Sequence, residues 1–569
     1  MSNELVRLST PRQTAQATLP DGRTWEAPVG TPVEAYVRAA YPDHPVPIIA
    51  ALVDGELREL TYPLTRDAQV TPIFLSDSDG VRIYRRSLSF LLVTAVSELF
   101  PNAQVVIDYS VPSGGFYCRV LNREPFSAEE LGTIEAHMRR IVEEDVPICK
   151  KRVPIEEALA LFQARGQEDK VRLFSRRRKD YLILYCLRDY QDYFHGYMVP
   201  STGYLRYFAL RPSPPGFILQ YPRRHWPTQL LPYTDSPRLS AVFQEYGEWL
   251  RLLGVEDVGD LNAAVENGRI REIILVSEAL HEERIAQIAH TIAEQHDRIR
   301  LVLIAGPSAS GKTTFSKRLS IQLLAHGVRP FPIALDDYFV DRHKTPRDEQ
   351  GQYDFEALEA LDLALFNQQL LALMDGREVT LPRFDFHSGT RQQGPTVQLT
   401  PDHVIIVEGI HGLNPNLVPM VPPERIFRVY VSALTQLNLD RHNRVPTTDT
   451  RLIRRIVRDA MYRGYTAEET LDRWESVRRG EKRHIFPYQE NADVMFNSAL
   501  VYELAVLKPL VEPLLRQVEP PSPRRVEAKR LLAFLEWFTP CPPDMVPDNS
   551  ILREFIGGSI LQDYIPLGR

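Results

Sequence analysis

A glycine-rich loop that ends in a lysine is the stretch of this sequence most clearly suited to chemistry. Gly306, Gly311, Lys312 and Thr313 form the pattern G-x4-G-K-T between an apolar run and a helical stretch. Such glycines let backbone N–H groups surround phosphates, while the lysine reaches the β- and γ-phosphates and the threonine hydroxyl holds Mg²⁺. The sequence therefore predicts a site for Mg²⁺ and ATP or GTP. Its nucleotide-binding residues are Gly306, Ser308, Ala309, Ser310, Gly311, Lys312, Thr313 and Thr314.

Carboxylates follow two further apolar runs. "VIIVEG" ends in Glu408, and "PFPIALDD" ends in Asp336 and Asp337. Ligands of open α/β sheets bind at the carboxyl ends of the strands, so Glu408 is expected in the metal shell. Phosphoryl transfer to a hydroxyl needs a base, and Asp336 is the candidate. Each carboxylate taken alone could equally be a solvated strand end or a turn cap.

An arginine-rich helix follows in "TDTRLIRRIVRDAMYRG". Arg451, Arg454, Arg455 and Arg458 are spaced to lie on one face, and Arg463 comes one turn later. Guanidinium groups present a planar fork of donors that suits phosphate. A basic stripe is commonly a solvated face, but beside a phosphate loop it predicts a lid that closes over the transferring phosphate.

The elements that must position these residues change character along the chain. From residue 301, near-continuous apolar strands alternate with helices, which indicates a parallel sheet covered on both faces. We predict a multidomain α/β and α+β protein with an N-terminal β-grasp, an α+β domain and a C-terminal doubly wound P-loop kinase domain. The expected boundaries are 1–76, 77–225, a helical connector at 226–298, the kinase domain at 299–517 and a helical tail at 518–569.

The β-grasp prediction depends on two turns and one helix. Asp21-Gly22 and Asp54-Gly55 each lie between β-rich flanks, which is a strong hairpin signal. Between them, "TPVEAYVRAAY" has helical spacing, with Thr31 as the expected N-cap and Pro32 at the first helical position.

Composition limits the class of protein. The 569 residues are 44% hydrophobic and carry a net charge of −7, which argues against wholesale coating of nucleic acid. No apolar run is long enough to span a membrane, no secretion signal is recognisable, and the four cysteines are far apart. We therefore expect a cytoplasmic protein with reduced thiols. The oligomeric state, including a homo-oligomer, stays open.

Several motifs together carry a resemblance. "GPSASGKTT", "LDDYF", "YDFE", "PRFDFHSGTR", "IIVEGIHGL", "DTRLIRRIVRDAMYRG" and "ADVMFNSA" occur in the order and spacing of the uridine kinase and phosphoribulokinase group, over about 299–500. The resemblance is closest to uridine–cytidine kinases. It implies Asp336 as general base near the metal, Glu408 as a Mg²⁺ ligand, and Lys312, Arg455, Arg458 and Arg463 around the transferring phosphate. It also assigns the acceptor site to Tyr338, Glu356, Phe384, Phe386, His387 and Arg391.

The sequence departs from that family at the acceptor site. The base-reading histidine is Gly389 here, one lid arginine is Tyr465, and the ribose-binding aspartate is Glu356. Loss of a base-reading hydrogen bond costs discrimination. The implied function is transfer of the γ-phosphate to the 5′-OH of a nucleoside such as uridine or cytidine. A kinase of another small alcohol, or a nucleotide-dependent RNA-binding or regulatory protein, remains an alternative.

Residues 17–225 resemble the N-terminal part of bacterial threonyl-tRNA synthetases, a TGS module followed by an editing module. The editing module's HxxxH and its later Cys and His correspond here to Arg86, Phe90, Phe194 and Met198. Cys186 and His195 are too isolated to replace that cluster. We expect the fold without the hydrolysis, with an RNA or tRNA contact, dimerisation or regulation of the kinase as open roles. The basic residues that could contact RNA are Lys150, Lys151, Arg152, Arg172, Arg176, Arg177, Arg178 and Lys179, which could equally be solvated charge.

Overall fold

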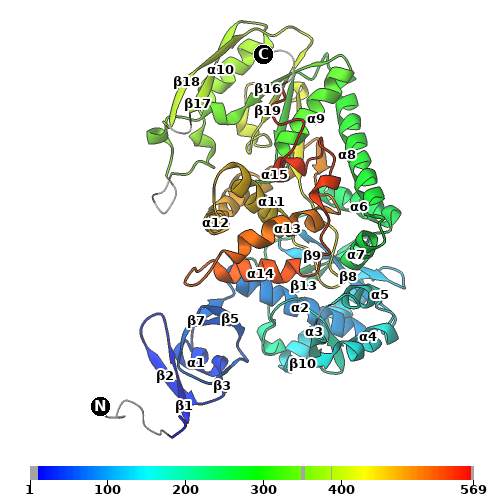
Figure 1. Ribbon diagram of the computed structural model, residues 1–569, viewed down its shortest axis with the longest axis vertical. Helices are drawn as coiled ribbons and strands as arrows, with labels where there is room; N and C mark the ends of the chain where they lie inside the picture. The colour runs from blue at the N-terminus through cyan, green and yellow to red at the C-terminus, as the bar shows by residue number, and fades with distance from the viewer. Residues whose placement is uncertain (1–9, 178, 348–350, 352, 386–387, 566–569) are drawn as a thin grey trace. The chain divides into compact units, whose positions relative to one another are not determined.

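The computed structural model describes residues 10–177, 179–347, 351, 353–385 and 388–565. The chain forms two compact units (Figure 1). The first comprises residues 1–234 with 438–444, and the second comprises 235–437 with 445–569. Each unit is described by itself.

The first unit begins with a β-grasp. Its sheet has the order β2-β1-β7-β4-β5, and β1 pairs with β7 in parallel. The elements are β1 (Thr14–Thr18), β2 (Thr24–Pro28), β3 (Thr31–Pro32), α1 (Val33–Ala40), β4 (Ile48–Val53), β5 (Glu56–Glu59), β6 (Pro63–Leu64) and β7 (Ala68–Phe74). The Asp21-Gly22 and Asp54-Gly55 turns join β1 to β2 and β4 to β5, so both predicted hairpins are confirmed.

The predicted cap of the first helix is wrong. Thr31 and Pro32 form β3, which pairs with β6, and α1 begins at Val33. The Thr31 hydroxyl donates to the carbonyl oxygen of Pro28 at 2.7 Å and caps no helical N–H group. Here strand pairing outcompetes the local N-cap signal, because the backbone of Thr31 is already committed to the β3–β6 pair.

The rest of the first unit is α+β. One sheet has the order β13-β14-β9-β8 and another has the order β10-β11-β12. The elements are α2 (Ser78–Leu99), β8 (Gln104–Val111), β9 (Gly115–Leu121), α3 (Ala128–Glu143), β10 (Cys149–Pro154), α4 (Ile155–Ala164), α5 (Glu168–Phe174), β11 (Tyr181–Leu187), β12 (Tyr190–Asp192), β13 (Ala209–Ser213) and β14 (Gly216–Gln220). Ser127 caps α3 in a reciprocal capping box with Glu130.

Residues 438–444 come from late in the chain but belong to the first unit. The N–H of Ile107 donates to the carbonyl oxygen of Arg441, and the Asn438 side chain donates to the carbonyl oxygen of Ile107. Sequence patterns did not predict this placement, because the segment carries no strand or helix periodicity of its own.

Buried charges hold residues 438–444 in place. The Lys170 ammonium lies 3.0 Å from a carboxylate oxygen of Asp192 and 3.2 Å from one of Asp440, and all three side chains are fully buried. His442 Nδ1 is 2.7 Å from the second Asp192 oxygen. Although burial alone would raise the pKa of Asp192, Lys170 and His442 lower it to about 2. Asp192 and Asp440 therefore depend on the ammonium of Lys170 for compensation.

Lys170→Met should strongly destabilise the first unit. The substitution leaves two buried carboxylates without their cation, and breaking a buried pair in this way costs about 3–5 kcal/mol. Urea unfolding of the full chain, followed by proteolysis within residues 1–234, measures the effect. The matched control is Lys151→Met, since Lys151 forms an exposed pair with Glu157 that is worth about 0–1 kcal/mol. Equal stability of the two variants would contradict the role of the buried network.

The second unit is built on a parallel sheet with the order β16-β19-β15-β20-β21. Helix α9 packs on β15, β16, β19 and β20, α8 packs on α9, and α6 packs on β21 (Figure 1). The strands are β15 (Leu301–Ala305), β16 (Arg329–Ala334), β19 (His403–Glu408), β20 (Ile426–Ser432) and β21 (Val494–Asn497), with a hairpin of β17 (Val379–Asp385) and β18 (Thr390–Val397). The predicted parallel α/β architecture is confirmed.

Helices make up most of the remainder of this unit. They are α6 (Pro237–Leu253), α7 (Val258–Glu266), α8 (Ile270–Ala293), α9 (Lys312–Ala325), α10 (Leu363–Met374), α11 (Thr447–Tyr462), α12 (Ala467–His484), α13 (Glu503–Arg516), α14 (Arg525–Leu535) and α15 (Arg553–Ile556). The expected helical tail at 518–569 therefore contains α14 and, near its end, α15, which is only one turn long. Helix α15 ends where Gly557 adopts a φ of +83°.

Two further expectations concern the whole chain. Among the described residues, no helix combines the length and apolar character needed to cross a membrane. All four cysteines are free thiols, but two of them are not far apart, since Cys149 on β10 lies directly opposite Cys186 on β11.

Candidate nucleotide and acceptor site

The glycine-rich loop connects the central strand β15 to α9. A Cβ atom on Gly306 would lie 1.9 Å from the carbonyl oxygen of Val431, so only glycine fits there. Ala309 and Gly311 have φ values of +58° and +82°, which turn the loop before α9 begins at Lys312. The first N–H groups of α9 have no acceptor within the helix, so they face the loop as anion-binding donors.

Thr313 and Glu408 meet at the carboxyl end of the sheet. The Thr313 hydroxyl donates to Glu408 Oε1 at 2.8 Å, because Glu408 ends β19 in register with Ile304 of β15. Burial raises the pKa of Glu408, and the nearby Lys312 ammonium opposes that rise. A hydroxyl beside a carboxylate is a donor set that fits Mg²⁺, which commonly uses one or two carboxylates together with phosphate oxygens. Among the described residues, no group of three or more His, Cys, Asp or Glu side chains could hold a metal ion.

Asp336 lies at the same edge of the sheet. It follows β16, whose last residue, Ala334, pairs with Glu408. Loss of hydration raises the pKa of Asp336, while Lys312 lowers it. The structure thus brings Lys312, Asp336 and Glu408 together, as the strand-end argument predicted.

Glu356 is the most strongly perturbed carboxyl group of this region. Burial, followed by repulsion from Glu481, raises the pKa of Glu356 from 4.5 to about 7. Helix α12 approaches closely at Gly480, where a Cβ would lie 2.8 Å from the Glu356 Cβ. Near neutral pH this carboxyl group can therefore either accept or donate a hydrogen bond, depending on its protonation state.

Glu356→Gln should stabilise the protein at pH 8 but not at pH 4.5. The folded pKa of about 7 exceeds the unfolded value of 4.5, so folding stability falls as the pH rises between them and the loss is complete above 7. Because glutamine cannot ionise, the variant should gain about 1–3 kcal/mol at pH 8. Denaturant unfolding at the two pH values measures the difference, with the exposed Glu359→Gln as control. A gain that is the same at both pH values would contradict this electrostatic origin.

Two arginines of the predicted stripe are buried and form ion pairs. Arg451 pairs with Glu481 at 2.5 Å and donates to the carbonyl oxygen of Ser308 at 3.0 Å. Arg454 pairs with Glu503 at 2.5 Å and donates to the carbonyl oxygen of Ser498 at 2.8 Å. Both are at most 1% exposed, so the solvated-face alternative is wrong for them. Both guanidinium groups are neutralised by carboxylates and donate to backbone carbonyls of the glycine-rich loop, Arg451 to Ser308 and Arg454 to Ala309.

The three arginines assigned to the lid share one carboxylate. Asp459 lies 3.2 Å from Arg455, 2.8 Å from Arg458 and 3.6 Å from Arg463. Arg455 also donates to the Ser308 hydroxyl at 2.7 Å. The three guanidinium groups are therefore gathered beside the loop with fewer carboxylates than cations, which leaves positive charge for phosphate.

The expected acceptor residues are only partly where the resemblance places them. The Tyr338 hydroxyl donates a hydrogen bond to Gln369 Oε1 at 2.9 Å, and Tyr338 is 1% exposed, so it is a core residue here. Arg391 pairs with Asp362 at 2.8 Å. Phe384 is buried and packs edge-on against Phe339. The predicted residues Phe386 and His387 lie outside the described residues.

Two of the three departures from the family pattern, Gly389 and Tyr465, each lie beside an arginine. Gly389 has a φ of +70°, and a Cβ there would lie 2.9 Å from Nε of Arg342. At the other position, the guanidinium of Arg473 stacks 4.0 Å above the ring of Tyr465. A positively charged group therefore lies beside each of these two positions.

Sequence reasoning missed several carboxylates that contact this site. Glu481 accepts from the N–H of Ser308 at 3.1 Å, and Glu503 and Asp459 hold arginines. Glu554, from the C-terminal tail, accepts from Thr314. Asp459 lies within the arginine motif, where the charge pattern drew attention only to its cations. No motif marks Glu481, Glu503 or Glu554, since each is a single acidic side chain far along the chain from the loop it meets.

In the first unit, three of the four positions at which the resemblance places metal ligands lie in a hydrophobic core. Phe90, Phe194 and Met198 are at most 2% exposed, and the two rings lie 5.2 Å apart. Arg86 donates to the carbonyl oxygen of Tyr197, and the His442 ring stacks on Phe194 at 6.0 Å. Apolar side chains therefore pack at three of these positions, and the fourth is an arginine bound to a backbone carbonyl.

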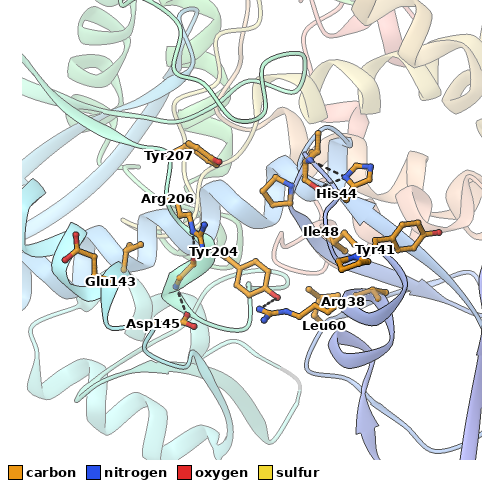
Figure 2. Close-up of a pocket in the computed structure, with 16 residues that line it drawn as sticks. Arg38, Tyr41, His44, Ile48, Leu60, Glu143, Asp145, Tyr204, Arg206 and Tyr207 are labelled. Atoms are coloured by element: carbon orange, nitrogen blue, oxygen red, sulfur yellow. Dashed lines mark hydrogen bonds between the residues drawn. The ribbon is translucent and has the colours of Figure 1, made fainter. Parts of the chain in front are cut away.

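The first unit also contains a cavity of about 820 Å³ that the sequence did not indicate. Figure 2 shows Arg38, Tyr41 and His44 of the β-grasp on one side and Tyr204 and Arg206 on the other. The Arg38 guanidinium donates to the Tyr204 hydroxyl at 2.9 Å, so the cavity wall is itself hydrogen-bonded.

The two halves of the chain are similar to different groups of known proteins. Residues 301–505 match the model of the Phosphoribulokinase / Uridine kinase family. This part of the second unit is therefore similar to kinases of that family, and its parallel sheet agrees with the similarity. Solved structures that align with the chain include a possible uridine kinase from Bacillus stearothermophilus (27% identity, 38% of this chain and 97% of that chain, TM-score 0.24). Another is D-glycerate 3-kinase from Cryptococcus neoformans, which is 15% identical over 47% of this chain and 89% of that chain, with a TM-score of 0.21.

The N-terminal part is similar to threonine–tRNA ligases. The ligase of Methylococcus capsulatus is 34% identical over 194 residues, and that of Methylobacillus flagellatus is 38% identical over 159 residues. These alignments cover 34% and 28% of this chain. The chain spans only about 30% and 25% of the length of these relatives.

Proposed function

We propose that this protein is a kinase that transfers the γ-phosphate of ATP or GTP to a hydroxyl group of a small molecule, with a nucleoside 5′-OH as the favoured acceptor. The observation that carries the proposal is the meeting of Lys312, Asp336 and the Thr313–Glu408 pair at one sheet edge. A nucleotide switch or sensor has no need of a base beside the metal-binding pair.

Each of these residues has a role in the proposed reaction. The loop N–H groups and Lys312 hold the triphosphate, and Thr313 and Glu408 hold Mg²⁺, which would neutralise phosphate charge when bound. Asp336 accepts the proton of the attacking hydroxyl, because it follows a strand at the same edge. Arg455 and Arg458 of α11, with Arg463 at its C-terminal end, stabilise the transferring phosphoryl group.

The acceptor is the least constrained part of the proposal. In the proposed site Glu356 binds acceptor hydroxyls, while Gly389 lacks the side chain that would read a pyrimidine edge. Arg342 beside Gly389 supplies hydrogen-bond donors of a different geometry. A small alcohol other than a nucleoside is therefore the second candidate acceptor.

Asp336→Asn should lower phosphoryl transfer by about 10²–10⁴-fold and leave nucleotide affinity nearly unchanged. Asparagine keeps the shape of the side chain but cannot accept the proton. Labelled ATP with a panel of nucleosides, sugars and pantothenate measures transfer and identifies the acceptor, and calorimetry measures binding of ADP with Mg²⁺. The exposed Asp375→Asn serves as control. Turnover of the Asp336 variant near the wild-type rate would contradict the assignment of the base.

We further propose that the protein is cytoplasmic and that its N-terminal half binds RNA, including tRNA. The similarity to threonine–tRNA ligases supports this, together with Lys151 and Arg152 on β10, at the edge of its sheet. Arg178, which belonged to the predicted basic patches, lies outside the described residues.

Filter binding with bulk tRNA at low ionic strength should show retention that weakens with salt, because phosphate contacts release counterions. Replacing Lys151 and Arg152 by glutamate should weaken binding. It should also reduce the slope of the logarithm of the binding constant against the logarithm of the salt concentration by about two. Lys344→Glu, in the second unit, is the control. Absence of salt-sensitive retention in the wild type would remove RNA from the proposal.

A further inference from the structure

The C-terminal tail crosses the glycine-rich loop. We call residues 548–562 the strap; it is closed by a hydrogen bond from the Ile560 N–H to the carbonyl oxygen of Asp548. From its single helical turn, Glu554 Oε2 accepts hydrogen bonds from the backbone N–H of Thr314 at 3.0 Å and from the Thr314 hydroxyl at 2.9 Å.

Those two donors belong to the phosphate cradle. Thr314 is the third residue of α9, so its N–H lacks an acceptor within the helix and points out of the helix N-terminus. In a loop of this pattern, such N–H groups bind the phosphates of the nucleotide, helped by the helix dipole. A carboxylate shares with phosphate a negative charge and acceptor oxygens, so Glu554 satisfies Thr314 as a phosphate would.

Glu554 also places negative charge where a triphosphate would add more. It contributes, after burial, to the raised pKa of Glu408. A phosphate group and the Glu554 carboxylate cannot both accept from the Thr314 N–H, and their charges repel each other.

The rest of the strap is fitted to the same site. Cγ2 of the buried Ile551 lies 2.5 Å from where a Cβ on Gly311 would be, so the strap packs directly on the loop glycine. Phe555 is fully buried, 5.0 Å beneath the guanidinium of Arg454. On the next turns of α9, Lys317 donates to the carbonyl oxygens of Leu561 and Gln562 at 2.6 and 2.8 Å.

We infer that the strap is autoinhibitory: Glu554 occupies a phosphate position of the loop, and nucleotide binds only after Glu554 leaves Thr314. The inference rests on the proposed nucleotide site of the same loop. The apparent dissociation constant then equals the intrinsic one divided by the fraction of molecules in which Glu554 is released. Because the strap and the loop belong to one chain, the released strap can return, so the inhibition is reversible.

The test measures nucleotide affinity rather than turnover. Isothermal titration of the full chain with ADP and Mg²⁺ should give a dissociation constant about tenfold lower for Glu554→Ala, and an intermediate decrease for Glu554→Gln, which keeps an acceptor but loses the charge. Asp548→Asn removes the same charge from an exposed strap position and should leave the affinity unchanged. Unchanged or weaker binding in both Glu554 variants would overturn the inference and leave the proposed kinase function standing.

Hydrogen exchange provides a second measurement. In the wild type, amides of residues 548–562 should exchange faster once ADP is bound, and in Glu554→Ala they should exchange fast without it. Protection that rises on ADP binding would overturn the inference, because the strap would then close over the nucleotide. Failure of the wild type and both variants to bind ADP would instead contradict the proposed nucleotide site itself.

Discussion

The close approach of the glycine-rich loop to the strand beside it is the constraint on which the site depends. Gly306 passes so near the carbonyl oxygen of Val431 that a methyl group would overlap it. This approach lets the loop turn back over the sheet edge and aim its N–H groups at one point. It also fixes where Lys312 and Thr313 begin α9, and hence which strand ends they meet. Glu408 and Asp336 reach the same point because parallel strands end together.

A glycine-rich loop keeps its shape without a ligand only if its surroundings hold it. Here the support comes from buried ion pairs, with Arg451 and Glu481 on one side and Arg454 and Glu503 on the other. Each pair is also hydrogen-bonded to backbone groups, which is the condition under which buried charges are tolerated. The loop is therefore shaped before any ligand arrives. Preorganisation of this kind lowers the cost of reorganising dipoles during phosphoryl transfer.

The sequence predicted the parts of the structure that depend on local pattern. The loop, the four apolar strands around it and the two hairpins with Asp-Gly turns are in this class, since each is encoded within about ten residues. The features that the sequence did not predict depend on contacts with residues far away in the chain. Thr31 loses its capping role to a strand pair with Leu64, and Arg451 is buried only because Glu481, on the next helix, neutralises it. The contact of Glu554 with Thr314 joins residues 240 positions apart, and no periodicity records it.

The first unit shows how a fold can keep its shape while its chemistry changes. Phe90 and Phe194 pack together at positions where the resemblance places metal ligands, and His442 from a distant segment stacks on them. Buried charges then tie that segment to the unit through Lys170. In the chain, this segment lies between β20 and α11, the helix that carries Arg451 and Arg455. Residues 438–444 therefore belong to the first unit by packing and by charge, although in the chain they lead into the arginine helix of the second unit. Their place is decided by buried partners that lie far away in the sequence, and no local pattern records it.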